Sequence, residues 1–322
     1  MIITRTPFRV SFTGGGSDLR EFYSKNGYGA VVSTAIQKYM YIVIHPYFQS
    51  KIRIKYSKTE DVATVDEIQH PIVKECLRKV QIGTGIEIAS FADVPAGTGL
   101  GSSSSFTVGL LNALYAYKGK IVPKERIARE ACEIEIDILK EPIGKQDQYA
   151  AAYGNINYIR FNRDETVDVS PILLTDASKQ GLENNLCLYY IGGKRKAGGI
   201  LHEQKKNISD NTIYQNLRTM TALSEELRDA LQREEIGAVG NLLHKGWLLK
   251  KDLANGISNE EIDGLYNKAL QNGAAGGKLL GAGGTGFLLL YSHDHEAMGK
   301  HLDCRALPFH IDREGTKILF YD

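Results

Sequence analysis

Apolar and polar residues alternate over the first dozen positions of the chain, which is the pattern of a strand with one buried face. Residues 2–12 alternate in this way. Segments 30–35, 39–46 and 51–56 are rich in β-branched and aromatic residues and predict neighbouring strands. A further strand is predicted at 86–91 and leads directly into a glycine-rich stretch. The N-terminal part of the chain is therefore expected to contain a sheet of several strands.

Apolar residues recur at helical spacing in many of the remaining segments. Helices are predicted at 19–25, 71–80, 102–117, 123–139, 146–153, 211–231, 236–249 and 259–272. Later strands are predicted at 155–161, 166–169, 186–191, 287–291 and 317–321. The polar stretch 173–185 is expected to be irregular, so we place a domain boundary there. We expect an α+β protein with two domains, 1–178 and 179–322, and a cleft between them.

Composition excludes several classes of function. The 322 residues include 39 basic and 38 acidic side chains, a net charge of +1, so no overall field attracts nucleic acid or a membrane. The four cysteines have no CxxC spacing, the histidines have no metal-binding spacing, and the apolar runs are too short to span a bilayer. We therefore expect a cytoplasmic protein without nucleic-acid or membrane partners.

The segment 93–105 reads Asp-Val-Pro-Ala-Gly-Thr-Gly-Leu-Gly-Ser-Ser-Ser-Ser and lies between a predicted strand and a predicted helix. Glycines let backbone N–H groups converge on an anion, and the following helix contributes its positive end. No Gly-Lys-Ser/Thr follows, and the pattern is not GxGxxG, so neither common nucleotide motif is present. The alternative is a flexible loop with a serine helix cap. The predicted nucleotide-binding residues are Pro95, Gly97, Gly99, Leu100, Gly101, Ser102, Ser103 and Ser104.

Three motifs in the proper order resemble those of the GHMP kinases, a family that includes galactokinase, homoserine kinase and mevalonate kinase. Residues 95–103 resemble the central motif, residues 7–18 the N-terminal motif and residues 278–286 the C-terminal motif. The resemblance implies an N-terminal domain with a left-handed βαβ crossover and a ferredoxin-like C-terminal domain. It also implies an ATP-dependent kinase that uses Mg²⁺.

Four shorter stretches are similar to the branch of this family that phosphorylates a heptose 7-phosphate. They are residues 7–18, 56–60, 70–73 and 144–149. This similarity implies transfer of the γ-phosphate of ATP to the anomeric hydroxyl of D-glycero-D-manno-heptose 7-phosphate, giving the 1,7-bisphosphate. Another sugar, such as fucose, galactose or an N-acetylhexosamine, is the alternative, and a nucleotide-binding sensor without turnover is a weaker one. The expected partner is a sugar or sugar phosphate, and the expected assembly is a monomer or homodimer.

Asp147 and Arg9 are the predicted catalytic residues. Asp147 opens a predicted short helix and matches the catalytic aspartate of the family, which orients the acceptor hydroxyl or accepts its proton. By position alone it would only stabilise a helix N-terminus. Arg9 lies in the first strand, where the family carries Arg or Lys near the γ-phosphate; Arg5 is the weaker alternative.

Ser103 and Glu135 are the predicted Mg²⁺ ligands, because Mg²⁺ prefers a few hard oxygen ligands and keeps several waters. Register against the family favours Glu135 over the neighbouring Glu133 and Asp137. The serine position carries an uncertainty of one residue, which leaves Ser102 and Ser104 open. The alternative for the acidic residues is a solvated helix face.

Substrate contacts are predicted from Asp18, whose carboxylate suits a pair of sugar hydroxyls and could otherwise cap a helix. Arg195, flanked by two lysines in a glycine-rich turn, is the predicted site for a second phosphate, and Lys145 is another possible anion contact. Clustered glycines mark places where the backbone approaches a ligand closely. The glycines predicted to do so are Gly15, Gly16, Gly283 and Gly284.

Overall fold

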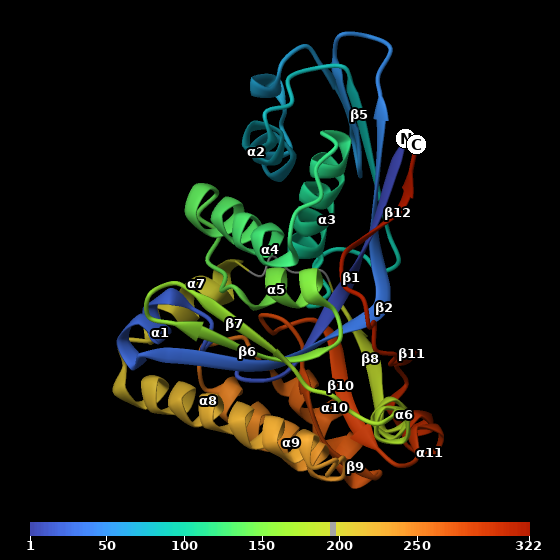
Figure 1. The fold of residues 1–322 in the computed structure, drawn as a ribbon. Coiled ribbons are helices and arrows are strands. Elements are labelled where there is room, and N and C mark those ends of the chain that lie inside the picture. Colours follow the sequence, from blue (N-terminus) through green and yellow to red (C-terminus); the bar gives the residue numbers. More distant parts are fainter. Residues whose placement is uncertain (194–197) are drawn as a thin grey trace.

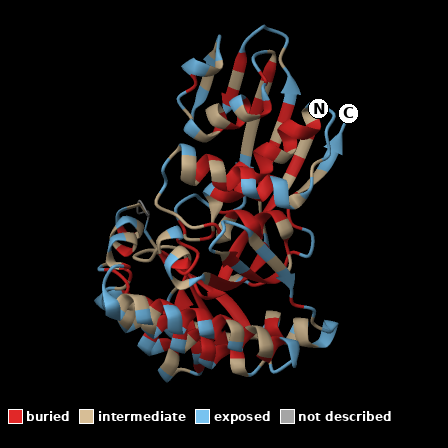
Figure 2. Ribbon diagram, turned by 60° about the vertical axis from the view of Figure 1, so that its left-hand side comes forward, coloured by how far each residue is buried: buried red, intermediate tan, exposed pale blue. Residues whose placement is uncertain are grey.

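The fold consists of two β-sheets with helices packed on and between them (Figure 1). It is a computed structural model, and it describes residues 1–193 and 198–322. Figure 2 shows that buried residues run through the strands in the middle of the molecule and along the inward faces of the helices. One large hydrophobic core joins the first sheet to α8 and α9, and a second core lies within the C-terminal half.

The first sheet has eight strands in the order β12-β1-β2-β5-β3-β4, with β6 and β7 continuing from β2. Its pairings are antiparallel except that of β3 with β5, which are parallel and are joined through α2. The strands are β1 (Ile2–Thr13), β2 (Tyr28–Pro46), β3 (Ile52–Lys55), β4 (Thr59–Val62), β5 (Ile86–Ala92), β6 (Ile156–Asn162), β7 (Val167–Pro171) and β12 (Lys317–Tyr321).

The second sheet has four antiparallel strands in the order β11-β8-β10-β9. Several helices separate β8 from β9, and one helix separates β10 from β11. The spatial order of the strands is fourth, first, third, second, which is the ferredoxin-like arrangement expected from the family resemblance. The strands are β8 (Leu186–Gly192), β9 (Ala274–Leu279), β10 (Gly286–Ser292) and β11 (Arg305–Pro308).

Helices cover the sheets and bring the functional segments together. The first group is α1 (Arg20–Asn26), η1 (Val65–Glu67), α2 (Pro71–Val80), α3 (Ser102–Tyr117), α4 (Lys124–Cys132), the π-helical turn η2 (Glu133–Ile138) and α5 (Gln146–Tyr153). The second group is α6 (Asp176–Asn185), α7 (Gly198–Asn207), α8 (Asn211–Gln232), α9 (Ala238–Lys251), α10 (Glu260–Gln271) and α11 (His295–Leu302). Helix α3 packs on β1 and β2, while α8 contacts β2 and α9 contacts β9. Within residues 1–193 and 198–322, no helix is long and apolar enough to cross a membrane.

The two ends of the described chain meet in the first sheet, where β12 pairs with β1 in antiparallel register. The Met1 ammonium group donates to the Asp322 carbonyl at 2.7 Å, and the Thr6 and Thr316 hydroxyls share a hydrogen bond of 2.8 Å. Figure 1 shows both termini side by side at one edge of the molecule.

Two sequence-based expectations about secondary structure are wrong. The segments 30–35 and 39–46 belong to one continuous strand, β2. Strand β1 pairs with residues of both segments, while β6 pairs with 28–34 and β5 with 40–46. The stretch 173–185 contains helix α6, whose first turn is capped by Thr175 through the Ser178 backbone N–H at 3.3 Å. The proposed boundary after residue 178 lies within this helix, and the division 1–178 and 179–322 stays a prediction.

Candidate active site

The glycine-rich loop ends in the N-terminus of α3, as the sequence pattern predicts. Gly97, Gly99 and Gly101 all have positive φ angles, of 81°, 84° and 73°, a conformation that glycine adopts without strain. Gly101 is the N-terminal cap of α3, and no side chain caps this end of the helix. The first backbone N–H groups of the helix therefore remain available to an anion.

Arg9 and Asp147 meet next to this loop. The Arg9 guanidinium binds the Asp147 carboxylate with two parallel hydrogen bonds, Nε to Oδ1 at 2.6 Å and Nη2 to Oδ2 at 2.8 Å. Its third nitrogen, Nη1, donates to the Gly99 carbonyl of the loop at 2.6 Å. Arg9 is buried, whereas the Asp147 side chain keeps 21% of its surface exposed. The pair therefore joins the loop to α5 and leaves the carboxylate accessible.

Gly101 lies directly against this ion pair. A Cβ atom on Gly101 would lie 3.1 Å from Arg9 Cγ and 3.2 Å from Asp147 Oδ2. The backbone at the start of α3 can approach the two charged groups this closely only because residue 101 has no side chain.

Ser103 and Glu135 also come together. Ser103 Oγ donates to Glu135 Oε1 at 2.5 Å, and Gln148 Nε2 donates to Glu135 Oε2 at 2.7 Å. Glu135 is fully buried, and this burial raises its pKa to about 7 despite the hydrogen bonds. The neighbouring Glu133 and Asp137 turn away to ion pairs with other elements.

Asp18 is buried beside the start of α5. Its carboxylate accepts from the Gly16 backbone N–H at 3.0 Å and from the backbone and side chain of Gln146 at 3.2 and 3.3 Å. Burial raises the pKa of Asp18, and the negative charge of Asp147 adds to this shift. Among the described residues, no partner binds Gln146 Oε1 or the Nε2 of Gln204, whose amide packs against Gly16. Buried polar atoms of this kind normally bind a partner.

A small cavity of about 140 Å³ opens beside Asp18 and Gly144. Arg20, Lys140 and Lys145 also line it, together with Lys205 from α7. A Cβ atom on Gly144 would lie 2.1 Å from Asp18 Oδ2, so this glycine permits the close packing of the 144–147 loop on Asp18.

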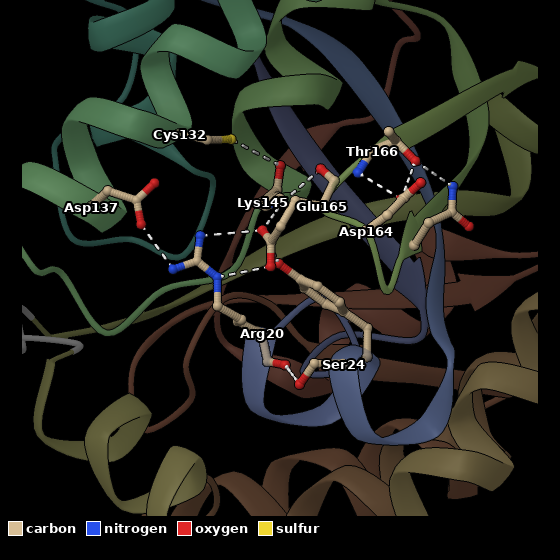
Figure 3. A network of polar contacts seen from close by, with 10 residues as sticks. Arg20, Ser24, Cys132, Asp137, Lys145, Asp164, Glu165 and Thr166 are labelled. Atoms are coloured by element: carbon tan, nitrogen blue, oxygen red, sulfur yellow. Dashed lines mark hydrogen bonds and ion pairs between the residues drawn. The ribbon is translucent and has the colours of Figure 1, made fainter.

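A polar network built around Glu165 (Figure 3) includes Arg20, Tyr23, Asp137 and Lys145, four residues that line this cavity. Glu165 accepts from Arg20 Nε at 3.0 Å, from Lys145 Nζ at 2.6 Å and from the Tyr23 hydroxyl at 2.8 Å. Arg20 Nη1 also donates to Asp137 at 2.8 Å. The network ties α1, η2 and the β6–β7 turn to Lys145, two residues before Asp147. Lys145, predicted as an anion contact, is therefore already engaged by a carboxylate.

The C-terminal glycine segment packs on the phosphate loop. A Cβ atom on Gly281 would lie 2.5 Å from Gly99 Cα, and one on Gly286 would lie 2.3 Å from the Thr98 carbonyl oxygen. Gly283 packs on the backbone of Ile257 instead, and the Gly284 N–H donates to the Ile257 carbonyl at 3.0 Å. Gly283 and Gly284 thus contact a loop of the C-terminal half, and their substrate role stays a prediction, as does that of Gly15, which faces Ser11.

The structure adds two buried lysines that sequence reasoning missed, Lys250 at the end of α9 and Lys278 in β9. A single lysine in a helical or strand pattern normally lies at the surface, so nothing indicated that these two are buried, although Lys278 is the first residue of the predicted C-terminal motif. The predicted phosphate contact Arg195 lies outside the described residues.

Both halves of the chain match models of the GHMP kinases: the model "GHMP kinases N terminal domain" matches residues 71–155, and "GHMP kinases C terminal" matches residues 227–304. The D-glycero-alpha-D-manno-heptose 7-phosphate kinase of Campylobacter jejuni is 28% identical over 305 residues, covering 90% of this chain and 89% of that protein. The galactokinase of Pyrococcus furiosus is 26% identical over 322 residues, covering 88% and 86%.

Solved structures agree on the fold. A crystal structure of a D-glycero-D-manno-heptose 1-phosphate kinase from Bacteroides thetaiotaomicron superposes with a TM-score of 0.81 at 22% identity, covering all of both chains. The three sequence motifs, the two-sheet fold and both family models thus agree. The chain belongs to the GHMP kinase family and is an ATP-dependent phosphotransferase with an alcohol group as acceptor.

Proposed function

We propose that this kinase transfers the γ-phosphate of ATP to the anomeric hydroxyl of D-glycero-D-manno-heptose 7-phosphate, giving the 1,7-bisphosphate. The observation that carries the proposal is the Arg9–Asp147 pair directly beside Gly101, at the loop suited to phosphates. The similarity to the Campylobacter jejuni heptose 7-phosphate kinase supports this sugar over others.

The acceptor hydroxyl lies against Asp147 in this proposal. As the new bond from the sugar oxygen to the γ-phosphorus forms and the bond to ADP breaks, the hydroxyl loses its proton, and Asp147 is the nearest carboxylate to it. Arg9 holds that carboxylate in one orientation and places positive charge beside the transferred group. Positioning and charge neutralisation are the main contributions that a protein makes to phosphoryl transfer.

The nucleotide phosphates fit the loop 95–104, because its glycines keep side chains away and the N-terminus of α3 has no side-chain cap. Within the part of the chain that the structure describes, no three His, Cys, Asp or Glu side chains gather to hold a metal ion. A hydroxyl, one buried carboxylate and phosphate oxygens suit Mg²⁺, which keeps several waters. Ser103 and Glu135 would hold it, and it would neutralise charge on the phosphates.

The sugar occupies the cavity beside Asp18 in this proposal. Asp18 lines this cavity and would accept hydrogen bonds from sugar hydroxyls. Arg20 and Lys145, which line the cavity, are already paired with the carboxylate of Glu165. Their positive charge is therefore largely neutralised, and the cavity suits a neutral polar group better than an isolated anion.

The test is a coupled assay of ADP release with Mg²⁺ over a panel of phosphorylated and free sugars. The proposal predicts turnover with D-glycero-D-manno-heptose 7-phosphate and a much lower kcat/KM with fucose, galactose and N-acetylhexosamines. Preference for free galactose would instead favour the second candidate, which the galactokinase similarity supports. Binding of ATP without ADP release on any sugar would contradict both.

A further inference from the structure

Two buried ammonium groups are not used by the mechanism above. Lys250 is 5% exposed and Lys278 is 3% exposed. The only hydrogen bond that Lys250 Nζ makes among the described residues is to the Gly281 carbonyl, at 2.5 Å. Lys278 Nζ has neither a hydrogen bond nor an ion pair within residues 1–193 and 198–322. A buried ammonium group is strongly unfavourable unless an anion accompanies it.

Lys250 contacts the glycine segment that packs beside the reacting centre, and Lys278 lies in β9, three residues before Gly281 in the same segment. Gly281, which accepts from Lys250, packs on Gly99 of the phosphate loop. The Gly99 carbonyl in turn accepts from Arg9. A short chain of contacts therefore connects the α9 lysine to the catalytic pair.

The electrostatics give the same location. Burial, together with the positive charge of Arg9, lowers the pKa of Lys250 to about 8, although the charges of Asp18 and Asp147 oppose the shift. Burial also lowers the pKa of Lys278 well below its usual value, with Lys250 and Arg9 adding to the effect and Asp18 opposing it. The charges of Lys250, Lys278, Arg9 and Asp18 therefore influence one another.

The protein's own carboxylates do not pair with these lysines. Both oxygens of Asp147 bind Arg9, and the Asp18 oxygens accept from Gly16 and Gln146. Arg9, Lys250 and Lys278 thus outnumber the two carboxylates, and neither lysine forms an ion pair with another described residue. An anionic ligand is the partner that this arrangement lacks.

We propose that Lys250 and Lys278 form a phosphate-binding site beside the Arg9–Asp147 pair, occupied by a phosphate group of one of the two substrates. This inference rests on the proposed function only where it takes a sugar phosphate as one of the two possible donors of the bound phosphate group. The γ-phosphate of ATP and the phosphate of the sugar phosphate share the same chemistry, so the experiment must separate them. A site for either one explains why positive charge is buried here: its counter-ion arrives with the substrate.

The test uses the Lys278→Met variant, which keeps the apolar stem and removes the charge, with Lys251→Met as the control. Lys251 is the neighbouring lysine on α9, and it pairs with Asp263 at 3.1 Å. Thermal unfolding is measured without ligand and with three probes: inorganic phosphate in saturating ADP, the non-hydrolysable analogue AMPPNP with Mg²⁺, and heptose 7-phosphate. Each titration yields a dissociation constant from the shift in melting temperature.

The proposal predicts a higher melting temperature for unliganded Lys278→Met than for the wild type, because an unpaired buried charge is gone. It also predicts that inorganic phosphate binds the variant at least about tenfold more weakly. If the variant also binds AMPPNP more weakly but binds heptose 7-phosphate normally, the site holds the γ-phosphate of ATP. If it binds heptose 7-phosphate more weakly but AMPPNP normally, the site holds the phosphate of the sugar. The Lys251→Met control should match the wild type with every probe.

Two results separate the failure of this inference from failure of the proposed function. If Lys278→Met melts below the wild type and binds all three probes with unchanged affinity, the lysines only offset the charge of Asp18 and the proposal is overturned. If inorganic phosphate binding depends on Lys278 while the wild type does not bind heptose 7-phosphate, the phosphate site stands and the sugar assignment fails.

Discussion

Replacing Lys250 by methionine should change the pH dependence of stability in a defined direction. The pKa of Lys250 is about 8 in the folded protein against an ordinary 10.5. A depressed lysine pKa means that the folded state holds the proton less tightly than the unfolded chain does. Between pH 8 and 10.5 the unfolded chain therefore binds more protons, and stability of the wild type rises with pH.

The magnitude follows from the same pKa shift. At about 1.4 kcal/mol per pKa unit, the charged Lys250 lowers the free energy of unfolding by about 3 kcal/mol below pH 8. The methionine variant escapes this cost but loses the hydrogen bond to Gly281, worth about 1 kcal/mol. We expect the variant to be more stable than the wild type by about 2 kcal/mol at pH 7 and less stable by about 1 kcal/mol near pH 10.5.

Urea unfolding of both proteins from pH 7 to 10.5 measures this difference. Groups remote from residue 250 titrate equally in both proteins and cancel, whereas loss of the Lys250 charge also raises the pKa of Lys278. The Lys251→Met control, on the same helix but partly exposed and paired with Asp263, tests whether removing any lysine from the end of α9 has the same effect. A Lys250→Met difference that stays constant with pH would refute the reasoning, because it would mean that the folded and unfolded states bind this proton equally.

Three further changes test other parts of the structure. Asp147→Asn should lower kcat by about 10²- to 10⁴-fold in the coupled ADP assay while leaving AMPPNP binding nearly intact, because the carboxylate acts on the acceptor hydroxyl; an unchanged kcat would remove it from the site. Gly101→Ala should lower stability by about 1–2 kcal/mol, since its φ is 73°, and should lower kcat/KM because the new methyl group meets Arg9 at 3.1 Å. Gly154→Ala should destabilise the fold by at least about 1–2 kcal/mol in urea unfolding, since its φ is 72° and a Cβ would lie 2.1 Å from the Gly315 nitrogen. Near-normal stability of the last variant would show that the 154–315 contact yields easily.

Local chemistry explains which parts of the site could be predicted. The loop at 97–101 and the start of α3 at Ser102 follow from glycine spacing and helix periodicity, which act over a few residues. The meeting of Arg9 with Asp147, and of Ser103 with Glu135, joins segments far apart in the chain. Only the family resemblance indicated those residues, and the contacts themselves follow from tertiary packing.

The features that were missed depend on long-range packing. Lys250 has an ordinary helical environment in the sequence, and its burial arises because α9 packs between the glycine segment near Gly281 and the first sheet. Helix α6 was expected to be irregular because its residues are polar, yet the Thr175 cap and the burial of Leu182 stabilise it. The strand β2 reads as two segments because Gln37 and Lys38 interrupt its apolar pattern, but pairing with β1 continues past them.

The pairing of β12 with β1 has a consequence for biosynthesis. The edge partner of the first strand consists of residues 317–321, which leave the ribosome only after the whole ferredoxin-like unit has been made. During synthesis, the outer edge of β1 therefore stays unpaired until residues 317–321 have been made. Contacts between residues so far apart in the sequence also form slowly. We expect stalled nascent chains that end before residue 317 to bind chaperones and to resist native compaction, even when every residue of the catalytic pair is already outside the exit tunnel.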